Sequence, residues 1–246
     1  MSDDIIAQNR DVYNDIAEHF SSTRSFLWRD LGMLTDYVQD GDTVLDVGCG
    51  NGRLYQLFSD LSSNKKQPLD EPYKPVERKQ VSYTGIDNSE ELIKIARDTY
   101  KDTQFVVGDM QRLPFDSSSF DVVFSIVAFH HMPTKSSQQK ALLEMKRVLK
   151  DGGYIIMLNW NAYSDWVNKK VEKGAYEYLG SHLFRVPWKK QNKEIIGDRV
   201  YYGFTPDELT ELFENANLTT LEQYYLRMGE ESDEANGMNI VSVVQK

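Results

Sequence analysis

The chain has 246 residues, with 38 acidic and 28 basic side chains and a formal net charge of −10. That charge opposes strong non-specific binding to nucleic acid, because such binding depends on neutralising phosphates. No run of about 18 apolar residues offers a membrane span, and the single cysteine, Cys49, excludes a disulfide framework within one chain. The acidic start lacks the basic and apolar order of a secretion signal. We therefore expect a cytoplasmic protein with one domain over residues 1–246.

Residues 1–40 are expected to form a helical cap ahead of the main fold. Apolar side chains recur at helical spacing through residues 11–20, and residues 21–24 are predicted to end that helix. Leu31, Leu34 and Val38 predict a second short helix. Helices in this position either cover a pocket or pack on a sheet, and the sequence leaves both interpretations open.

The stretch from Val44 to Gly52 carries the first chemical signal. It predicts a buried strand, followed by a tight turn with glycines at positions 48, 50 and 52, on which a ligand rests. In the dinucleotide fingerprint the last glycine comes later, whereas here Arg53 holds that place. Asp46 would repel a pyrophosphate but suits a ligand with an ammonium group. Cys49 fits the turn as a small buried residue, with a reactive thiol as the alternative.

Residues 54–61 are predicted as the helix that follows the turn. Residues 62–80 hold three prolines and no apolar period, so they predict a mobile insertion at the edge of the sheet opposite the ligand. A strand over 81–86 then ends at Asp87, whose carboxylate is placed to accept hydrogen bonds from ribose hydroxyls. Capping of the next helix is the alternative role for Asp87, and Asn88 or Ser89 can also cap it.

Further strands are predicted over 104–107, 120–126 and 154–158, with a helix between the last two. This alternation predicts an α/β fold with a doubly wound, mostly parallel sheet. His130 and His131 follow the 120–126 strand, and at most one of them faces a pocket if the strand continues. The other two histidines add no ligand spacing, so no metal site is predicted.

Residues 160–204 are aromatic and locally basic, and we expect them on the substrate side. Between positions 182 and 199, two acidic residues accompany five basic ones, namely Arg185, Lys189, Lys190, Lys193 and Arg199. A capping box at Thr205–Glu208 begins a helix. Strands over 219–226 and 238–244 are expected to pair antiparallel and close the sheet.

The sequence D-V-G-C-G-N-G, from Asp46 to Gly52, resembles motif I of the class I S-adenosylmethionine (SAM)-dependent methyltransferases. The acid at position 87, G-D-M at 108–110 and D-G-G at 151–153 follow in that family's order. The resemblance implies a Rossmann-like sheet of seven strands with an antiparallel closing strand, N-terminal helices over the pocket, and SAM as cofactor. The residues it assigns to the cofactor are Asp46, Gly48, Cys49, Gly50, Asp87, Asn88, Asp109, Met110 and Ser125.

Four segments apart from these motifs, residues 12–24, 130–131, 186–188 and 199–202, look like the eukaryotic tRNA wobble-uridine carboxymethyl methyltransferases. This resemblance implies esterification of the carboxylate of 5-carboxymethyluridine in tRNA, with a small zinc-containing activator protein as partner. The chain departs from the pattern in lacking a lysine-rich insertion and in its acidic charge, which bears on tRNA binding more than on chemistry. A small-molecule O- or C-methyltransferase and a non-catalytic partner subunit are the alternatives.

Methylation of an ionised carboxylate depends on placement more than on acid-base help. Arg24 is the candidate to orient that carboxylate, since its planar fork suits bidentate pairing, with a surface salt bridge as the alternative. His130 or His131 is the candidate to hydrogen-bond the substrate. The candidates to hold a base or phosphate are Tyr13, Arg185, Arg199 and Tyr201, although buried aromatics more often serve the core.

Overall fold

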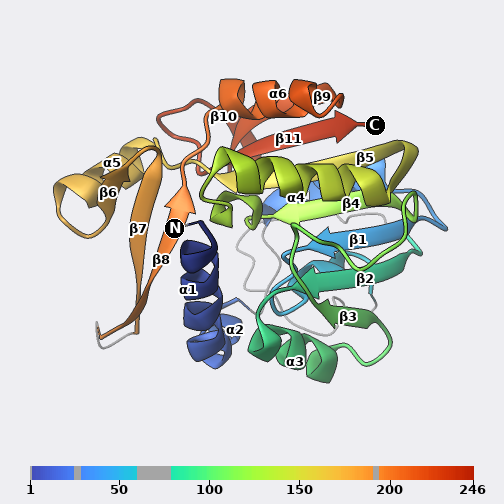
Figure 1. The fold of residues 1–246 in the computed structure, drawn as a ribbon, viewed down its shortest axis with the longest axis horizontal. Helices are drawn as coiled ribbons and strands as arrows, with labels where there is room; N and C mark the ends of the chain where they lie inside the picture. The colour runs from blue at the N-terminus through green and yellow to red at the C-terminus, as the bar shows by residue number, and fades with distance from the viewer. Residues whose placement is uncertain (1, 25–28, 60–78, 191–193) are drawn as a thin grey trace.

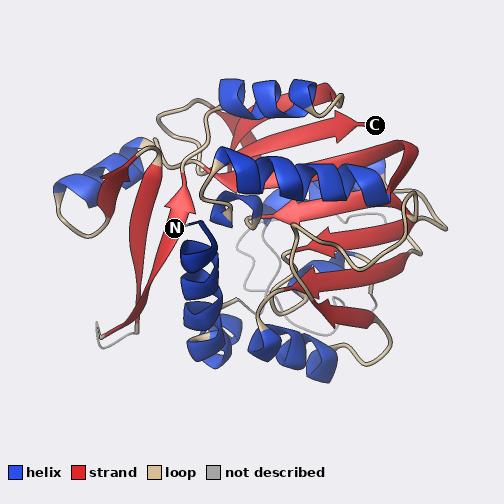
Figure 2. Ribbon diagram, viewed as in Figure 1, coloured by secondary structure: helices blue, strands red, loops and turns tan. Residues whose placement is uncertain are grey.

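The computed structural model describes residues 2–24, 29–59, 79–190 and 194–246. A large eight-stranded sheet carries helices on both faces, and a three-stranded sheet stands beside it (Figures 1 and 2). The order in the large sheet is β10-β9-β11-β5-β4-β1-β2-β3. Its strands are β1 (Thr43–Val47), β2 (Ser82–Asp87), β3 (Gln104–Val107), β4 (Phe120–Ile126), β5 (Leu149–Trp160), β9 (Thr219–Arg227), β10 (Glu230–Ser232) and β11 (Asn239–Gln245).

The centre of this sheet is parallel and buried on both faces. β1 pairs in parallel with β2 on one side and with β4 on the other. Leu45 and Val47 point into one apolar core, and Val44 points into the core on the opposite face. Because both faces are covered, the strand is a nearly continuous apolar run rather than an alternating one.

Helices cover the two faces, as the doubly wound prediction requires. Leu142 of α4 and Leu209 of α6 belong to one core, whereas Ile93 of α3 belongs to the other. The predicted capping box is present, since the Thr205 side chain accepts from the Glu208 N–H and the Glu208 side chain accepts from the Thr205 N–H. These helices are α3 (Glu90–Thr99), α4 (Lys135–Val148) and α6 (Pro206–Asn215).

The closing strand β11 runs antiparallel between β5 and β9, which confirms the predicted closure. The sheet has eight strands rather than seven, because the chain turns back after β9 and adds the short strand β10 at the edge. β5 begins earlier than expected, since Leu149 already pairs with Phe120 of β4.

The N-terminal segment forms α1 (Ser2–Asp15) and α2 (Ala17–Thr23), which meet at the buried Ile16. The helix predicted over 11–20 is thus interrupted at Ile16, and α2 continues past Ser21 to Thr23, with Arg24 as its C-cap, later than predicted. The hydroxyls of Ser22 and Thr23 donate to the His19 carbonyl, so these polar residues are satisfied within the last turn. The predicted second helix is the 3₁₀ segment η1 (Arg29–Tyr37).

Residues 160–204 fold into a helix and a small antiparallel sheet in the order β6-β7-β8. Its strand β8 lies along α1 (Figure 1), because the Asn9 side chain donates to the Val200 carbonyl and accepts from the Val200 N–H, both at 2.8 Å. Gly197 permits this approach, since a Cβ there would lie 2.8 Å from the Val12 side chain. The elements are α5 (Asp165–Glu172), β6 (Glu177–Gly180), β7 (Leu183–Lys189) and β8 (Ile195–Tyr202).

The glycine turn leads into a short 3₁₀ helix, η2 (Arg53–Leu57), in place of the helix predicted over 54–61. The predicted insertion over 62–80 lies outside the described residues except for positions 79 and 80. Its position relative to the sheet therefore stays a prediction. Within the described ranges, no helix combines the length and the apolar character needed to cross a lipid bilayer.

Candidate functional site

The glycine turn is held against the ends of two neighbouring strands. The Gly48 and Cys49 N–H groups both donate to the Ile86 carbonyl at the end of β2, at 2.7 and 3.0 Å. Gly48 has a φ of +80°, and a Cβ at this position would lie 2.2 Å from the Ala128 Cβ. Glycine is therefore required here for both conformation and space.

The early third glycine has a packing explanation. Gly52 has a φ of +76°, and a Cβ there would lie 2.6 Å from the Phe105 ring of β3. The departure from the dinucleotide spacing thus lets the turn approach β3, so the turn contacts three parallel strands.

Asp87 joins the turn to the next helix. One carboxylate oxygen accepts from the Gly50 N–H at 2.8 Å, and the other accepts from the Ser89 N–H at 2.9 Å. Ser89, and not Asp87, is the N-cap of α3. Each Asp87 oxygen keeps a second lone pair for a ligand hydroxyl. Burial raises the pKa of the Asp87 carboxyl above its ordinary value.

Asp46 is a buried acid, and one of its two carboxylate oxygens has no hydrogen-bond donor in the described part of the chain. The Tyr83 hydroxyl donates to Oδ2 at 2.6 Å, whereas Oδ1 is buried with no hydrogen-bond partner in the described part of the chain. Burial, together with the nearby Asp87, raises the pKa of Asp46 to about 7. A buried acceptor of this kind requires a donor, and a ligand ammonium group would supply it.

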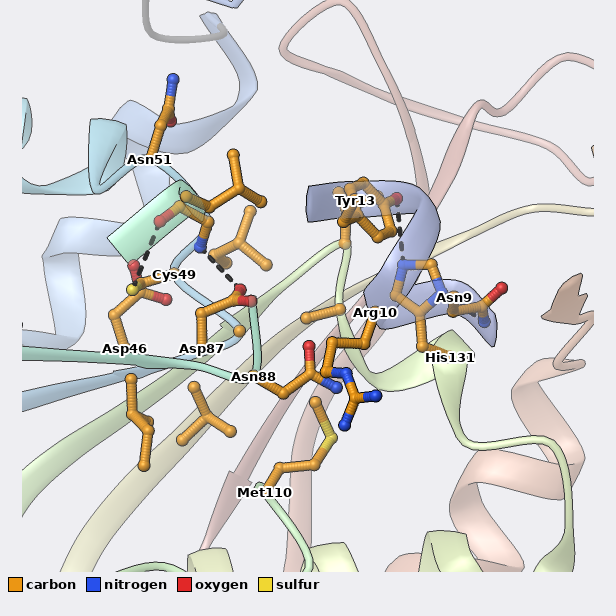
Figure 3. A pocket seen from close by; sticks show the side chains of 18 of the residues that line it. Asn9, Arg10, Tyr13, Asp46, Cys49, Asn51, Asp87, Asn88, Met110 and His131 are labelled. Carbon is orange, nitrogen blue, oxygen red and sulfur yellow. Dashed lines mark hydrogen bonds between the residues drawn. The ribbon is translucent and has the colours of Figure 1, made fainter. Parts of the chain in front are cut away.

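Both acids line a cavity formed by the turn, the strand ends and the N-terminal helices (Figure 3). Figure 3 shows Asp46, Cys49 and Asp87 on one side of it, and Tyr13 and His131 on the other. Eight of the nine residues predicted for the cofactor line this cavity: Asp46, Gly48, Cys49, Gly50, Asp87, Asn88, Asp109 and Met110. Burial raises the pKa of the Cys49 thiol well above its ordinary value, which favours a packing role for Cys49 over a reactive one.

The opposite side, which we call the arginine half, consists of Tyr13, Arg24, His131, Arg199 and Tyr201. The guanidinium carbons of Arg24 and Arg199 each lie 4.7 Å from the ring centre of Trp188. Neither guanidinium has a carboxylate partner among the residues that the structure describes, and Arg199 Nε is buried without any hydrogen-bond partner there. Burial, with a contribution from Arg199, lowers the pKa of Arg24.

Both ring nitrogens of His131 have polar neighbours. The Asn9 amide is oriented by its two bonds to Val200, and its nitrogen lies 3.3 Å from His131 Nδ1. The Tyr13 hydroxyl lies 3.2 Å from His131 Nε2. Burial, the adjacent His130 and Arg199 lower the pKa of His131 well below its ordinary value, so the ring is neutral.

Residues 38–217 match the family described as "Methyltransferase domain". The chain is a class I SAM-dependent methyltransferase.

Curated relatives of the methyltransferase carry one recurring name. The mouse "tRNA (carboxymethyluridine(34)-5-O)-methyltransferase ALKBH8" is 31% identical over 87% of this chain and 29% of its own length. The Schizosaccharomyces pombe protein of the same enzyme name is 28% identical over 88% of this chain and 90% of its own length. An Arabidopsis thaliana relative with this name is 32% identical over 61% of this chain and 32% of its own length. The methyltransferase thus spans about a third of the first two relatives, those from Arabidopsis and mouse.

Two solved structures share the fold. A Methanosarcina mazei SAM-dependent methyltransferase has a TM-score of 0.64 at 21% identity, covering 87% of this chain and 96% of its own. A Haloferax volcanii putative methyltransferase, in a complex with the Trm112 methyltransferase activator, has a TM-score of 0.63 at 21% identity, covering 96% of both chains. At this identity the likeness concerns the fold alone.

The cavity of the methyltransferase fits SAM. The open Asp46 oxygen suits the ammonium group, the glycine turn leaves room for the ligand against the backbone, and Asp87 suits the ribose hydroxyls. SAM supplies a methyl group on a sulfonium, a strong electrophile.

Three predicted site residues do not line the cavity. Ser125 is fully buried within β4. His130 lies behind His131, edge-on to Tyr201 at 4.7 Å, and burial lowers its pKa to about 3. Arg185 lies on β7 and pairs with Glu177 of β6. The strand predicted over 120–126 does not continue through the two histidines, because β4 ends at Ile126 and both histidines occupy a 3₁₀ turn.

The predicted basic patch over 182–199 is divided in the structure. Arg199 points into the cavity, Lys190 pairs with Glu194 at 3.4 Å, and Lys193 lies outside the described residues. In the described part of this segment, Arg185, Lys190 and Arg199 therefore do not share one exposed cationic surface. The side chain of Arg199 instead serves the arginine half.

Sequence reasoning missed several cavity residues. Ile6, Asn9 and Arg10 line the cavity with Tyr13 from one face of α1, and their helical spacing was the available signal. Val127 also lines the cavity at a φ of +55°. A β-branched residue rarely adopts this conformation, and no pattern in the sequence predicts a positive φ at Val127.

Proposed function

We propose that the methyltransferase transfers the SAM methyl group to the carboxylate of 5-carboxymethyluridine at the wobble position of tRNA. The names of the relatives support this substrate. The observation that carries the proposal is the arginine half of the cavity. Two guanidinium groups without a carboxylate partner in the described chain face the same cavity as the cofactor residues.

An anionic methyl acceptor is complementary in charge to the arginine half. A guanidinium that is removed from water without an anionic partner keeps an uncompensated charge, and a carboxylate pairs with it through strong charge-assisted bonds. Asp46 and Asp87 repel the same carboxylate from the other end of the cavity. The charges of the two halves therefore orient the acceptor with its anion toward Arg24 and Arg199.

The transfer balances without a general base. A lone pair of the carboxylate oxygen forms the new bond to the methyl carbon, and the carbon–sulfur bond breaks with its electrons on sulfur. The products are a neutral ester and S-adenosylhomocysteine, and no proton moves. This agrees with a neutral His131, which is suited to hold Tyr13 rather than to remove a proton.

We also propose a small activator protein as partner. The Haloferax volcanii structure named above supports an activator, since it contains a protein named as a methyltransferase activator in a complex with a methyltransferase of the same fold. The zinc content of the partner rests on the family resemblance alone.

The test uses tritiated SAM with tRNA that carries 5-carboxymethyluridine, with and without the candidate activator. The expected product is a methyl ester, so mild alkali should release the label as methanol. tRNA that carries unmodified uridine at the wobble position is the matched control and should take no label. Alkali-stable label, or label only in small molecules, would contradict the proposal while leaving the methyltransferase family assignment intact.

A further inference from the structure

Three aromatic side chains lead from the surface toward the arginine half of the cavity. Trp166 on α5 meets Tyr176 at 5.8 Å between ring centres, and Tyr176 meets Trp160, the last residue of β5, at 6.1 Å. Trp160 in turn meets Tyr201 at 5.4 Å, and Tyr201 lines the cavity. We call Trp166, Tyr176 and Trp160 the aromatic file.

Burial increases along the aromatic file toward the cavity. Trp166 is 43% exposed, Tyr176 and Trp160 are half-buried, and Tyr201 is buried at 8%. An exposed tryptophan is unusual for a surface that only meets water. The outer end of the file therefore has the character of a contact surface, and its inner end reaches the proposed methylation site.

The cationic neighbour of the file is also suited to a nucleic acid. The Lys170 ammonium lies 5.2 Å from the centre of the Trp166 ring. Residues 165–180 contain three lysines and three acidic residues, so this segment is neutral in a chain whose net charge is −10. An RNA strand approaching the cavity from this side meets less repulsion than the average surface would give.

We propose that the aromatic file stacks an unpaired nucleobase of the RNA next to the nucleotide whose carboxylate is methylated. The inference rests on the proposed function and specifies how its substrate is held. Rings placed beside a basic side chain bind single strands without regard to sequence, because every base offers a flat face.

The size of the surface favours a base over a protein. A protein partner needs about 800 Å² on each side for a stable complex. A tryptophan offers at most about 250 Å², and the remainder of the file is half-buried. The area is small for a protein but suits one or two flat rings.

The experiment compares Trp166→Ala and Trp166→Phe with Tyr178→Ala, which removes an aromatic ring that is 49% exposed and that packs on Phe184 instead. Trp166→Ala should raise KM for the modified tRNA about 5- to 10-fold, with kcat/KM for free 5-carboxymethyluridine unchanged. Trp166→Phe should restore most of the loss, and Tyr178→Ala should have no effect. The salt dependence of KM should be the same in all variants, because stacking neutralises no phosphate.

Equal KM values for Trp166→Ala and the wild type would overturn the inference while leaving the proposed function in place. Loss of the activator with an unchanged KM would assign Trp166 to a protein contact and would overturn it as well. A wild-type protein that methylates no tRNA would refute the proposed function instead. In that case an unmodified oligouridylate provides the test: it should quench the tryptophan fluorescence of the wild type more than that of Trp166→Phe, since the chain has four tryptophans, and equal quenching in the two proteins would overturn the inference.

Discussion

Lowering the pH from 7.5 to 6.0 is expected to weaken SAM binding about eightfold, because the Asp46 carboxyl must ionise to receive the ligand ammonium group. The pKa of Asp46 is raised to about 7 by burial and by Asp87. With that value, the protonated fraction reduces the affinity about elevenfold at pH 6.0 but only about 1.3-fold at pH 7.5, a difference of about 1.2 kcal/mol. The ligand ammonium stays mostly protonated over this window, so ionisation of Asp46 determines the direction in which SAM affinity changes with pH.

Calorimetric titration in two buffers of different ionisation enthalpy measures the effect directly. Binding at pH 6.0 should release close to one proton, and binding at pH 7.5 should release much less. Tyr83→Phe removes the bond that holds the pKa of Asp46 down, so it should move the pH midpoint upward. Asp46→Asn should bind weakly at every pH, and any proton release left in that variant belongs to Asp87, whose pKa is also raised. An affinity independent of pH between 6.0 and 7.5 would refute the reasoning.

The same shift has a consequence for stability. The pKa of Asp46 in the folded protein lies above its ordinary value of 3.8, so the folded state binds more protons than the unfolded state between about pH 4 and 7. Stability contributed by the protonated form is therefore lost as the pH rises through that window. Asp46→Asn should remove this loss and raise the unfolding temperature most clearly at pH 8.

Three further predictions follow from the geometry. Arg24→Ala or Arg199→Ala should raise the acceptor KM about tenfold or more through loss of a charge-assisted bond, with SAM affinity unchanged; Arg185→Ala, which removes a cation paired with Glu177, should not. Gly48→Ala should abolish SAM binding, because its Cβ would meet Ala128 at 2.2 Å. Gly152→Ala is the control for the backbone effect, since Gly152 has the same φ of +80° but nothing within 4 Å of an added Cβ. Equal losses of SAM affinity in the two variants would contradict the steric argument. Asn9→Leu should lower the unfolding temperature by leaving two buried Val200 groups unpaired at about 1–3 kcal/mol each, and Gln8→Leu, which removes one exposed bond, should be nearly neutral.

The part of the site that can be predicted from sequence is the part that is local in sequence. Asp46, Gly48, Asp87 and Asp109 all lie in or just after the last residues of parallel strands, and the carboxyl ends of such strands meet at one edge of a sheet. Strand existence and order then place these side chains together without any knowledge of packing. The extra strand β10 and the early start of β5 differ only at element ends, which sequence patterns define least well.

The arginine half cannot be predicted from the order of the strands. Its residues come from α1, the end of α2, the turn after β4 and strand β8, and no strand order brings these segments together. The prediction of a basic patch is limited for a related reason, since composition over 182–199 does not distinguish the two sides of a strand. Arg185 and Arg199 lie on paired strands, but one meets Glu177 and the other faces the cavity.

These two origins imply a functional separation within one cavity. The residues proposed for SAM lie on turns fixed by the parallel sheet, whereas the acceptor residues depend on α1, which Asn9 joins to β8. A change that shifts α1 against β8 is therefore expected to move Tyr13 relative to Arg199, while Asp46 keeps its place in β1. Asp87 is less independent of α1, because Asn14 of α1 accepts a hydrogen bond from the hydroxyl of the nearby Ser89 at 2.7 Å. Since transfer requires a short in-line approach of oxygen to methyl, a displacement of about 1 Å lowers the rate by about 100-fold. We therefore expect loss of the contact between Asn9 and Val200 to lower the transfer rate by misplacing the acceptor residues, although neither residue is proposed to take part in the transfer.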